Sequence, residues 1–214
     1  MMDVEIRSFT FGPVGANMYV LLFGKQALVI DPCCPWGNTG LSDDVRVTSV
    51  LCTHGHFDHI SEADDIVPRF LCPLYISSED SPMLSDASLN HSMHFGMMVR
   101  VDSPYKVLDK KVYSNEELGI TDSGRFNMQV VPTPGHTSGS VCYYFNFIGN
   151  AKQYMFTGDM LFRRSIGRTD LGGSELDMTR SIELLKTMND DIVCFPGHGS
   201  ETILGEEKHR NPYF

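Results

Sequence analysis

The sequence predicts a layered α/β protein with sheet inside and helices outside. Two observations lead to this expectation. Short apolar runs typical of strands come first in the chain, and strand, helix and strand patterns then alternate in two roughly similar halves. A chain of 214 residues, of which 42% are hydrophobic, is long enough to bury a sizeable core.

Four runs in the first half are rich in apolar and β-branched residues, which is typical of strands. They are residues 18–23, 27–30, 45–53 and 73–77. Residues 24–26, Gly-Lys-Gln, separate the first two runs and suit the tight turn of a hairpin. Ser61 followed by Asp64 resembles a capping box, so we expect a short helix that begins there and that Pro68 limits.

The second half opens with an irregular segment. Residues 78–104 are polar, rich in methionine and broken by Pro82 and Pro104, so we expect short helices or a loop there. A clear helix is predicted for residues 174–188, where apolar residues recur at helical spacing and Ser174 can cap the first turn. Further strand patterns cover residues 105–108, 126–133, 141–147, 153–158 and 191–195.

Charge and composition exclude several classes of function. The net charge of −10 argues against binding nucleic acid through its phosphates. The chain has no apolar run near the roughly 20 residues that span a bilayer, and residues 1–12 lack the apolar core of a signal peptide. We therefore expect a cytoplasmic protein that acts on a small molecule, without a membrane or nucleic-acid partner. Oligomeric state is not predicted.

The stretch T-H-G-H-F-D-H, residues 53–59, carries three of the eight histidines. In an extended segment, His54 and His56 point the same way and can meet at one point. Asp58 and His59 come next, where the chain turns into a helix, and can face a second point close by. Imidazole and carboxylate groups are the ligands that divalent transition metals favour, so the stretch predicts two adjacent metal ions.

Three more candidate ligands lie downstream. His136, Asp159 and His198 each follow a predicted strand in a turn that contains glycine. Strand ends are where α/β folds gather functional groups, so all three are expected at the same end of the sheet. A single histidine after a strand is commonly structural, but the set of three together with the first cluster favours a metal centre.

The ordered motifs T-H-G-H-F-D-H (53–59), P-G-H-T (134–137), T-G-D (157–159) and P-G-H-G (196–199) resemble the metallo-β-lactamase fold superfamily over almost the whole chain. The resemblance implies an αββα sandwich, with two mixed sheets between outer helices, formed as one domain by residues 1–214. It assigns His54, His56 and His136 to metal site one. It assigns Asp58, His59 and His198 to site two, with Asp159 bridging both.

A narrower likeness comes from residues 160–174 and from the tail at 196–214, which resemble the glyoxalase II-like hydrolases of the short single-domain bacterial and archaeal type. In those enzymes the loop after the bridging aspartate carries Lys and Tyr that hold glutathione. Arg168 and Asp170 occupy the matching positions here. Arg168 keeps a charge for a substrate carboxylate, whereas the missing Tyr argues against strict specificity for glutathione.

The resemblance implies a dinuclear metal-dependent hydrolase of thioesters, in which a hydroxide bridging the two metals attacks the carbonyl. Asp159 would hold the metals at a fixed separation, and Asp58 would relay the proton. The expected cofactors are two divalent ions, with Zn²⁺ favoured and Fe or Mn able to use the same ligands. The substrate would be a small molecule such as an ester of glutathione or of another thiol.

Other functions stay open at this stage. A mononuclear iron persulfide dioxygenase shares the fold and a G-R-T-D segment, but has P-A-H-D where this chain has P-G-H-G. A superfamily hydrolase of another ester or phosphoester and a non-catalytic metal-binding module are further alternatives.

Several residues near these motifs have no assigned role. His91 and His94 either line the substrate mouth or are exposed, and His209 is expected to be solvated in a charged tail. Arg163 and Arg164 are either surface charges or partners of the ligands. Buried thiols are expected for most of the cysteines, which are Cys33, Cys34, Cys52, Cys72, Cys142 and Cys194.

Overall fold

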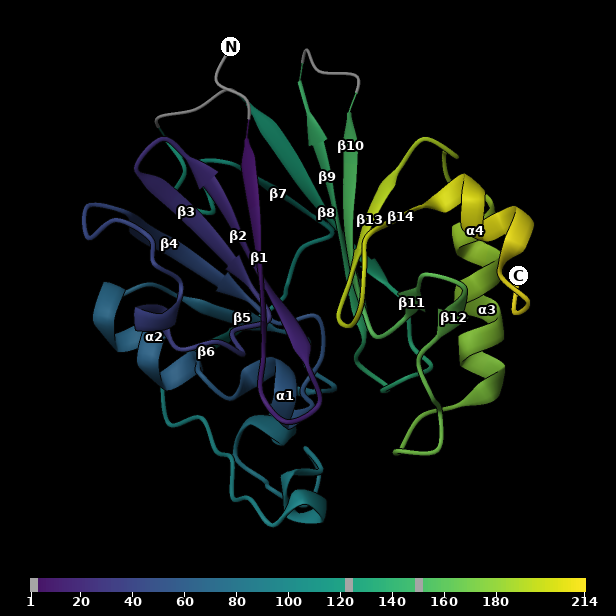
Figure 1. Ribbon diagram of the computed structural model, residues 1–214, viewed down its shortest axis with the longest axis horizontal. Helices are drawn as coiled ribbons and strands as arrows, with labels where there is room; N and C mark the ends of the chain where they lie inside the picture. Colours follow the sequence, from purple (N-terminus) through teal and green to yellow (C-terminus); the bar gives the residue numbers. More distant parts are fainter. Residues whose placement is uncertain (1–3, 122–124, 149–151) are drawn as a thin grey trace.

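The computed structural model describes residues 4–121, 125–148 and 152–214. Two six-stranded sheets pack face to face, with α2 outside one sheet, α3 and α4 outside the other, and α1 at the lower ends of the strands (Figure 1). The predicted αββα sandwich with two mixed sheets is therefore confirmed.

The first sheet has the strand order β1-β2-β3-β4-β5-β6. Its first three strands are antiparallel neighbours and include the predicted hairpin, whereas β3 to β6 run parallel. The bounds are β1 (Glu5–Phe11), β2 (Ala16–Phe23), β3 (Gln26–Ile30), β4 (Arg46–Leu51), β5 (Leu74–Ile76) and β6 (Tyr105–Val107). The sequence did not predict β1, an edge strand that is mostly exposed and so lacks a long apolar run.

The second sheet has the strand order β14-β13-β10-β9-β8-β7. Only the pairing of β10 with β13 is parallel in it. The bounds are β7 (Val112–Ser114), β8 (Phe126–Pro132), β9 (Val141–Phe147), β10 (Gln153–Gly158), β13 (Val193–Pro196) and β14 (Thr202–Ile203). A separate two-stranded sheet joins β11 (Leu161–Phe162) to β12 (Ser165–Ile166).

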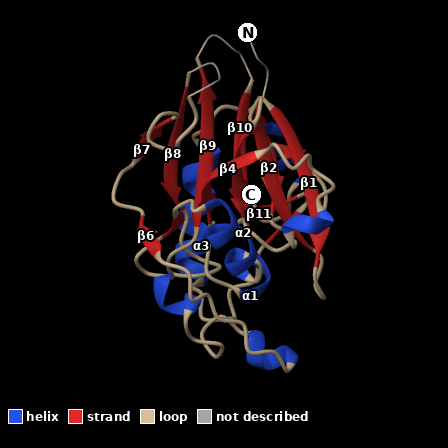
Figure 2. Cartoon of the chain, turned by 90° about the vertical axis from the view of Figure 1, so that its left-hand side faces the viewer, coloured by secondary structure: helices blue, strands red, loops and turns tan. Residues whose placement is uncertain are grey.

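The helices are short apart from α3. They are α1 (Phe57–Ile60), α2 (Ala63–Phe70), α3 (Glu175–Lys186), α4 (Leu204–Arg210) and the 3₁₀ helices η1 (Trp36–Asn38), η2 (Ser81–Leu84) and η3 (Ser92–Phe95). The α3 prediction is confirmed, including its cap, because the Ser174 side chain accepts a hydrogen bond from the backbone N–H of Asp177. Residues 78–104 form short 3₁₀ helices and loops, as expected, and include the lowest part of the chain in Figure 2.

Two local predictions were wrong. Ser61 is not the N-cap of a helix but the C-cap of α1. Glu62 is the N-cap of α2, and its side chain forms no capping hydrogen bond. The Asp64 carboxylate instead accepts hydrogen bonds from the backbone N–H groups of Asp102 and Ser103, which anchors the end of the irregular segment. Pro68 does not limit α2, which continues to Phe70, since a proline removes only one backbone donor and buried residues hold the helix in place.

The tail also differs from the expectation. Residues 204–210 form α4, in which Leu204 and Glu207 are buried. His209 is exposed, as expected, but on a helix rather than in a tail. Within the described part of the chain, no helix is both long enough and apolar enough to cross a membrane.

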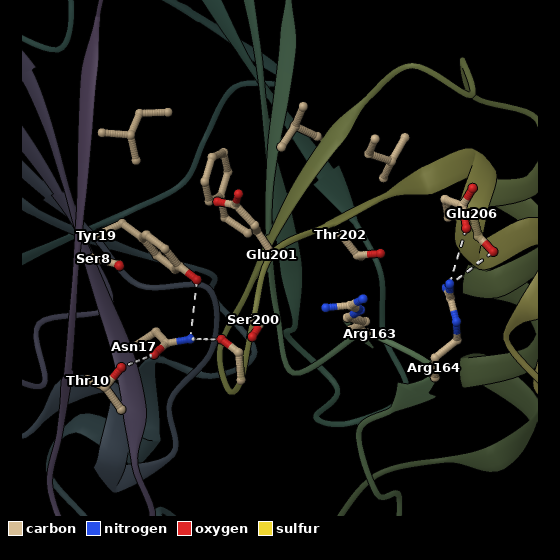
Figure 3. Close-up of a pocket in the computed structure, with 15 residues that line it drawn as sticks. Ser8, Thr10, Asn17, Tyr19, Arg163, Arg164, Ser200, Glu201, Thr202 and Glu206 are labelled. Atoms are coloured by element: carbon tan, nitrogen blue, oxygen red, sulfur yellow. Dashed lines mark hydrogen bonds and ion pairs between the residues drawn. The ribbon is translucent and has the colours of Figure 1, made fainter.

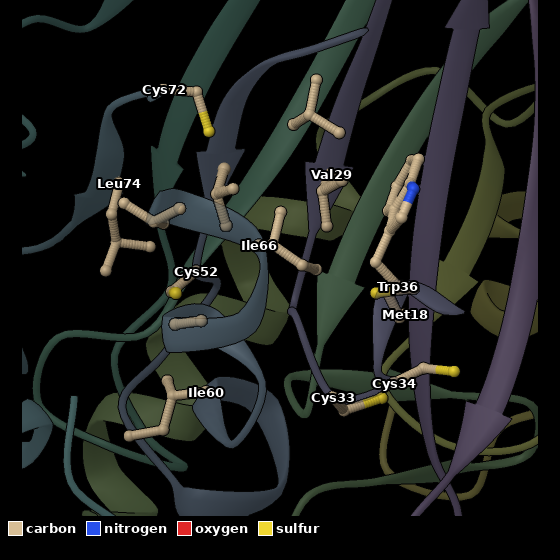
Figure 4. Packing of buried hydrophobic residues seen from close by; sticks show 14 of the residues in the cluster. Met18, Val29, Cys33, Cys34, Trp36, Cys52, Ile60, Ile66, Cys72 and Leu74 are labelled. Carbon is tan, nitrogen blue, oxygen red and sulfur yellow. The ribbon is translucent and has the colours of Figure 1, made fainter. Parts of the chain in front are cut away.

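Three layers of buried side chains hold the sandwich together. Figure 4 shows the layer between the first sheet and α2, where Met18 and Val29 on the strands lie near Ile66 on the helix and Trp36 on η1. The middle layer joins the sheets through aromatic residues such as Tyr143 and Phe156, and the third lies under α3. All six cysteines are buried free thiols, as predicted.

Candidate metal centre

The seven predicted ligands come together at one end of the two sheets. His54 follows β4, Asp159 follows β10 directly, and His198 lies two residues beyond β13. Each of these side chains follows the end of a strand, and strand ends are where α/β folds gather functional groups. The complete set is His54, His56, Asp58, His59, His136, Asp159 and His198. Each of its histidine rings contacts at least one other histidine ring of the set.

Three buried imidazoles form a first group of candidate ligands. One ligand atom from each of His54, His56 and His136 lies within 4.8 Å of the others. His136 Nε2 is 2.8 Å from His56 Nδ1. Burial lowers the pKa of His54 well below its usual value and that of His56 to about 3, so both rings are neutral near pH 7. Neutral imidazole is the form that binds metal.

Asp58, His59 and His198 form the second group, with ligand atoms again within 4.8 Å. Asp58 Oδ2 is 3.4 Å from His59 Nε2 and 3.2 Å from His198 Nε2. Burial acts against ionisation, but these two histidines hold the pKa of Asp58 well below its usual range. Burial also acts against protonation of His198, but hydrogen bonds to Asp159 and Asp58 raise its pKa to about 9.

Asp159 lies between the two groups. Its Oδ1 is 3.3 Å from His59 Nε2, and its Oδ2 is 3.5 Å from both His136 Nε2 and His198 Nε2. The carboxylate therefore faces members of both groups at once. This is the position that a bridging ligand requires.

Four polar atoms in this cluster are buried without a hydrogen-bond partner: His54 Nε2, His56 Nε2, His59 Nε2 and Asp159 Oδ1. The last two approach each other at 3.3 Å without the geometry of a hydrogen bond. A buried polar atom left unpaired costs about 1–3 kcal/mol, so four in one place indicate a missing partner. Imidazole nitrogen and carboxylate oxygen are the atoms that coordinate Zn²⁺, Fe or Mn, and the cluster therefore fits metal ions.

Asp31, which the sequence did not single out, orients one ligand. Its Oδ1 accepts a hydrogen bond from the backbone N–H of Thr53 at 2.7 Å, and its Oδ2 accepts one from the Thr53 hydroxyl at 2.8 Å. Oδ2 is also 3.0 Å from His59 Nδ1. A proton on Nδ1 leaves His59 Nε2 as the free lone pair that faces the site. The position of Asp31 directly after the buried strand β3 was the sequence signal that could have identified it.

Asp80 was also missed, and it joins the two loops that carry the first group. Its Oδ2 accepts hydrogen bonds from the backbone N–H of Gly55 at 3.0 Å and from the Thr137 hydroxyl at 2.6 Å. Its Oδ1 accepts one from the backbone N–H of Gly139 at 2.9 Å. A Cβ on Gly139 would lie 2.5 Å from Asp80 Oδ1, so this close approach requires glycine. No pattern in the sequence marks Asp80, because its role depends on distant contacts.

Backbone carbonyl oxygens lie beside two further candidate ligands. His136 Nδ1 lies 2.7 Å from the Arg168 carbonyl oxygen, and His198 Nδ1 lies 3.2 Å from that of Gly15. A proton on each Nδ1 would donate to these carbonyls and leave Nε2 facing the centre.

A cleft of about 360 Å³ opens beside the cluster, and five of the seven residues line it. His91 lies at its mouth, with its ring 5.0 Å from the ring of His56 and its Nε2 3.1 Å from the Leu171 carbonyl oxygen. Arg168 lies on the rim and forms two hydrogen bonds with Asp170. The lining residues are Val14, His56, Phe57, Asp58, His91, Phe95, His136, Asp159, Phe162, Gly167, Arg168, Leu171 and His198.

The other singled-out residues lie outside this cleft. His94 is exposed and stacks on His91. Burial raises the pKa of Cys33 to about 12, which makes it an inert thiol. Arg164 pairs with Glu206 and Glu207.

A larger cleft of about 940 Å³ lies between the sheet edges formed by β1 and β14 (Figure 3). Arg163 lines it, together with Asn17 and Glu201. None of the seven clustered residues lines it.

Comparison with known proteins decides the family. Residues 11–198 match the model of the metallo-beta-lactamase superfamily. The chain belongs to this superfamily. The matched residues run from the end of β1 to His198, so they contain every residue of the cluster.

Two relatives and two solved structures show where the chain lies within the metallo-beta-lactamase superfamily. It is 34% identical to the probable metallo-hydrolase YqgX of Bacillus subtilis, over 97% of this chain and 96% of the relative. It is also 34% identical to the hydroxyacylglutathione hydrolase GloC of Haemophilus influenzae, over 79% of this chain and 77% of the relative.

The structure of the BLEG-1 B3 metallo-beta-lactamase superimposes with a TM-score of 0.83 and 31% identity, covering 98% of this chain and 99% of that one. The structure of TTHA1623 in a di-iron-bound form gives a TM-score of 0.80 and 29% identity, covering 97% and 100%.

Proposed function

We propose that this protein is a dinuclear metal-dependent hydrolase that cleaves thioesters, in the manner of glyoxalase II-like enzymes. The observation that carries the proposal is the pair of candidate ligand groups, with Asp159 between them and four buried atoms that lack a hydrogen-bond partner. Similarity to the GloC hydroxyacylglutathione hydrolase supports a thioester substrate.

The two groups would each hold one metal ion. His54, His56 and His136 would hold the first, and Asp58, His59 and His198 the second, with Asp159 shared between them. Such a pair of ions supplies a water nucleophile at neutral pH and polarises the carbonyl that it attacks. Zn²⁺ is favoured, because a thiolate leaving group suits a borderline-soft ion. Fe or Mn can use the same ligands, and the similar TTHA1623 was solved with two irons.

The protein's own groups would position the substrate and move a proton. Asp58 lines the cleft beside both groups, so its carboxylate would be placed to accept a proton from the nucleophile. Asp31 keeps His59 in one tautomer, and the buried position of the cluster limits the access of bulk water. Arg168 on the rim is the proposed substrate-contacting residue.

Hydrolysis of β-lactams is a second candidate, because the BLEG-1 structure is similar over nearly the whole chain. Lactams and thioesters both present an electrophilic carbonyl, but the bond broken is C–N in a lactam and C–S in a thioester. Direct comparison of substrates is needed to separate them.

The test is to measure thiol release from S-D-lactoylglutathione and a small thioester panel by the zinc-loaded protein, with nitrocefin as the lactam. We expect thiol release, and we expect His56→Ala and Asp159→Ala to abolish it and to lower the metal content. His209→Ala is the matched control, because that histidine is exposed on α4 and should keep both properties. Faster turnover of nitrocefin, or oxygen uptake on glutathione persulfide with no thiol release, would overturn the proposal.

A further inference from the structure

Apart from the clustered residues, the side chains that line the cleft are mostly apolar. Phe57 and Phe95 contact each other with ring centroids 4.9 Å apart. Phe162 stands edge-on to His198 with centroids 5.9 Å apart, so an apolar surface begins directly beside a proposed metal ligand. Val14 and Leu171 complete this lining. A group attached to a carbonyl at the metal centre would therefore extend outward against apolar side chains.

Apolar side chains also continue into the segment that carries Phe95. In this segment, Met93 is 55% exposed, Phe95 is 51% exposed and Met98 is 66% exposed. Exposed apolar side chains that gather beside a cleft commonly mark a ligand-binding groove, and methionine adapts to ligands of different shape. Of these three side chains, Phe95 lines the cleft, so the segment contributes an exposed aromatic ring to its wall.

The rim offers little net charge to an anionic substrate. Among the described residues that line the cleft, Arg168 is the one lysine or arginine. Its guanidinium nitrogens lie 2.6 Å and 2.5 Å from the two carboxylate oxygens of Asp170. This pair is exposed and close to neutral as a unit.

We infer that the preferred substrate is a thioester with an uncharged, apolar acyl group that lies along this cleft. The inference rests on the proposed thioester hydrolysis and narrows it. The volume of about 360 Å³ is near the lower end of the roughly 300–1,000 Å³ found for small-molecule sites, which suits an acyl chain of medium length.

The test uses acetyl, butyryl and hexanoyl thioesters of N-acetylcysteamine, a small uncharged thiol, with S-D-lactoylglutathione as the charged reference. Each methylene buried against the cleft should raise kcat/KM by about fourfold. The hexanoyl thioester should therefore be cleaved more efficiently than the acetyl thioester, and more efficiently than S-D-lactoylglutathione.

Three variants connect the selectivity to the named residues. Phe95→Ser should lower the ratio of hexanoyl to acetyl kcat/KM by about tenfold, because it removes a large part of the apolar wall. Leu184→Ser is the matched control, since Leu184 is similarly exposed at 42% but lies on α3 away from the cleft. Asp170→Asn frees the charge of Arg168 and should improve kcat/KM for S-D-lactoylglutathione relative to the hexanoyl thioester.

The outcomes separate this inference from the proposed function. A flat acyl series with S-D-lactoylglutathione preferred would overturn the apolar specificity and leave thioester hydrolysis standing. The same holds if Phe95→Ser and Leu184→Ser change the acyl ratio equally. Absence of thiol release from every thioester would overturn the proposed function, and this inference with it.

Discussion

Replacing Asp80 by Asn should weaken metal binding without touching a metal ligand. The carboxylate accepts three hydrogen bonds, from Gly55 N–H, Thr137 Oγ1 and Gly139 N–H, through both of its oxygens. An amide has one acceptor oxygen, so at least one backbone N–H in a ligand loop loses its partner. A hydrogen bond to a charged group contributes about 1.5–3 kcal/mol, and we expect the free energy of unfolding to fall by about that amount.

The assays are thermal unfolding and a zinc titration by calorimetry. In a chain of this size, each kcal/mol shifts Tm by about 2–4 °C, so Asp80→Asn should melt roughly 3–12 °C below the wild type. Zinc affinity should fall by about 10–100-fold, as for other residues that orient metal ligands. The loss should be largest for the ion held by the first group, since Gly55 lies between His54 and His56.

Glu79→Gln is the matched control, because this neighbouring carboxylate is exposed and its hydrogen bond is with Ser78. Zinc affinities and Tm values that are equal for Asp80→Asn and Glu79→Gln would refute the reasoning. A lower Tm with unchanged zinc affinity would restrict Asp80 to supporting the fold.

Three further predictions follow from the same geometry. Gly139→Ala should destabilise the protein by about 1–3 kcal/mol in urea unfolding, because its Cβ would lie 2.5 Å from Asp80 Oδ1; an unchanged midpoint would contradict the close approach. In the metal-free protein, the raised pKa of His198 means that its protonation stabilises the fold fully below about pH 6.5 and that this contribution is lost as the pH rises through about 9. The fall in Tm between these values should shrink in His198→Gln, and an equal fall in both proteins would count against the contacts of His198 with Asp58 and Asp159. Removing zinc with a chelator should lower the free energy of unfolding by about 2.7 kcal/mol for each site that was held at 100 times its Kd, and a chelator-insensitive Tm would argue against bound metal.

The clustering of the seven candidate ligands was predictable because several of them follow strands. A strand end places its next polar residue at a defined edge of the sheet, so His136, Asp159 and His198 could be expected to meet the stretch 53–59. The hairpin of β2 and β3 was predictable for a similar reason. Its residues are buried almost throughout, so its apolar runs are long and uninterrupted.

The residues that support the candidate ligands could not be predicted from the sequence in the same way. Asp80 acts through Gly139, 59 positions away, and such a contact leaves no local pattern. Ser61 and Asp64 show the opposite case, in which a good local pattern was overridden, because Asp64 binds the backbone of Asp102 and Ser103 instead. The edge strand β1 was missed because a mostly exposed strand carries no apolar signature.

The seven clustered residues are proposed to hold two metal ions. The most direct measurement is elemental analysis of the zinc-loaded protein after removal of free metal, on the wild type and on Asp159→Ala. We predict two zinc ions per chain in the wild type and fewer in Asp159→Ala, because Asp159 faces both ligand groups. One ion per chain in the wild type, or the same content in both proteins, would contradict the claim.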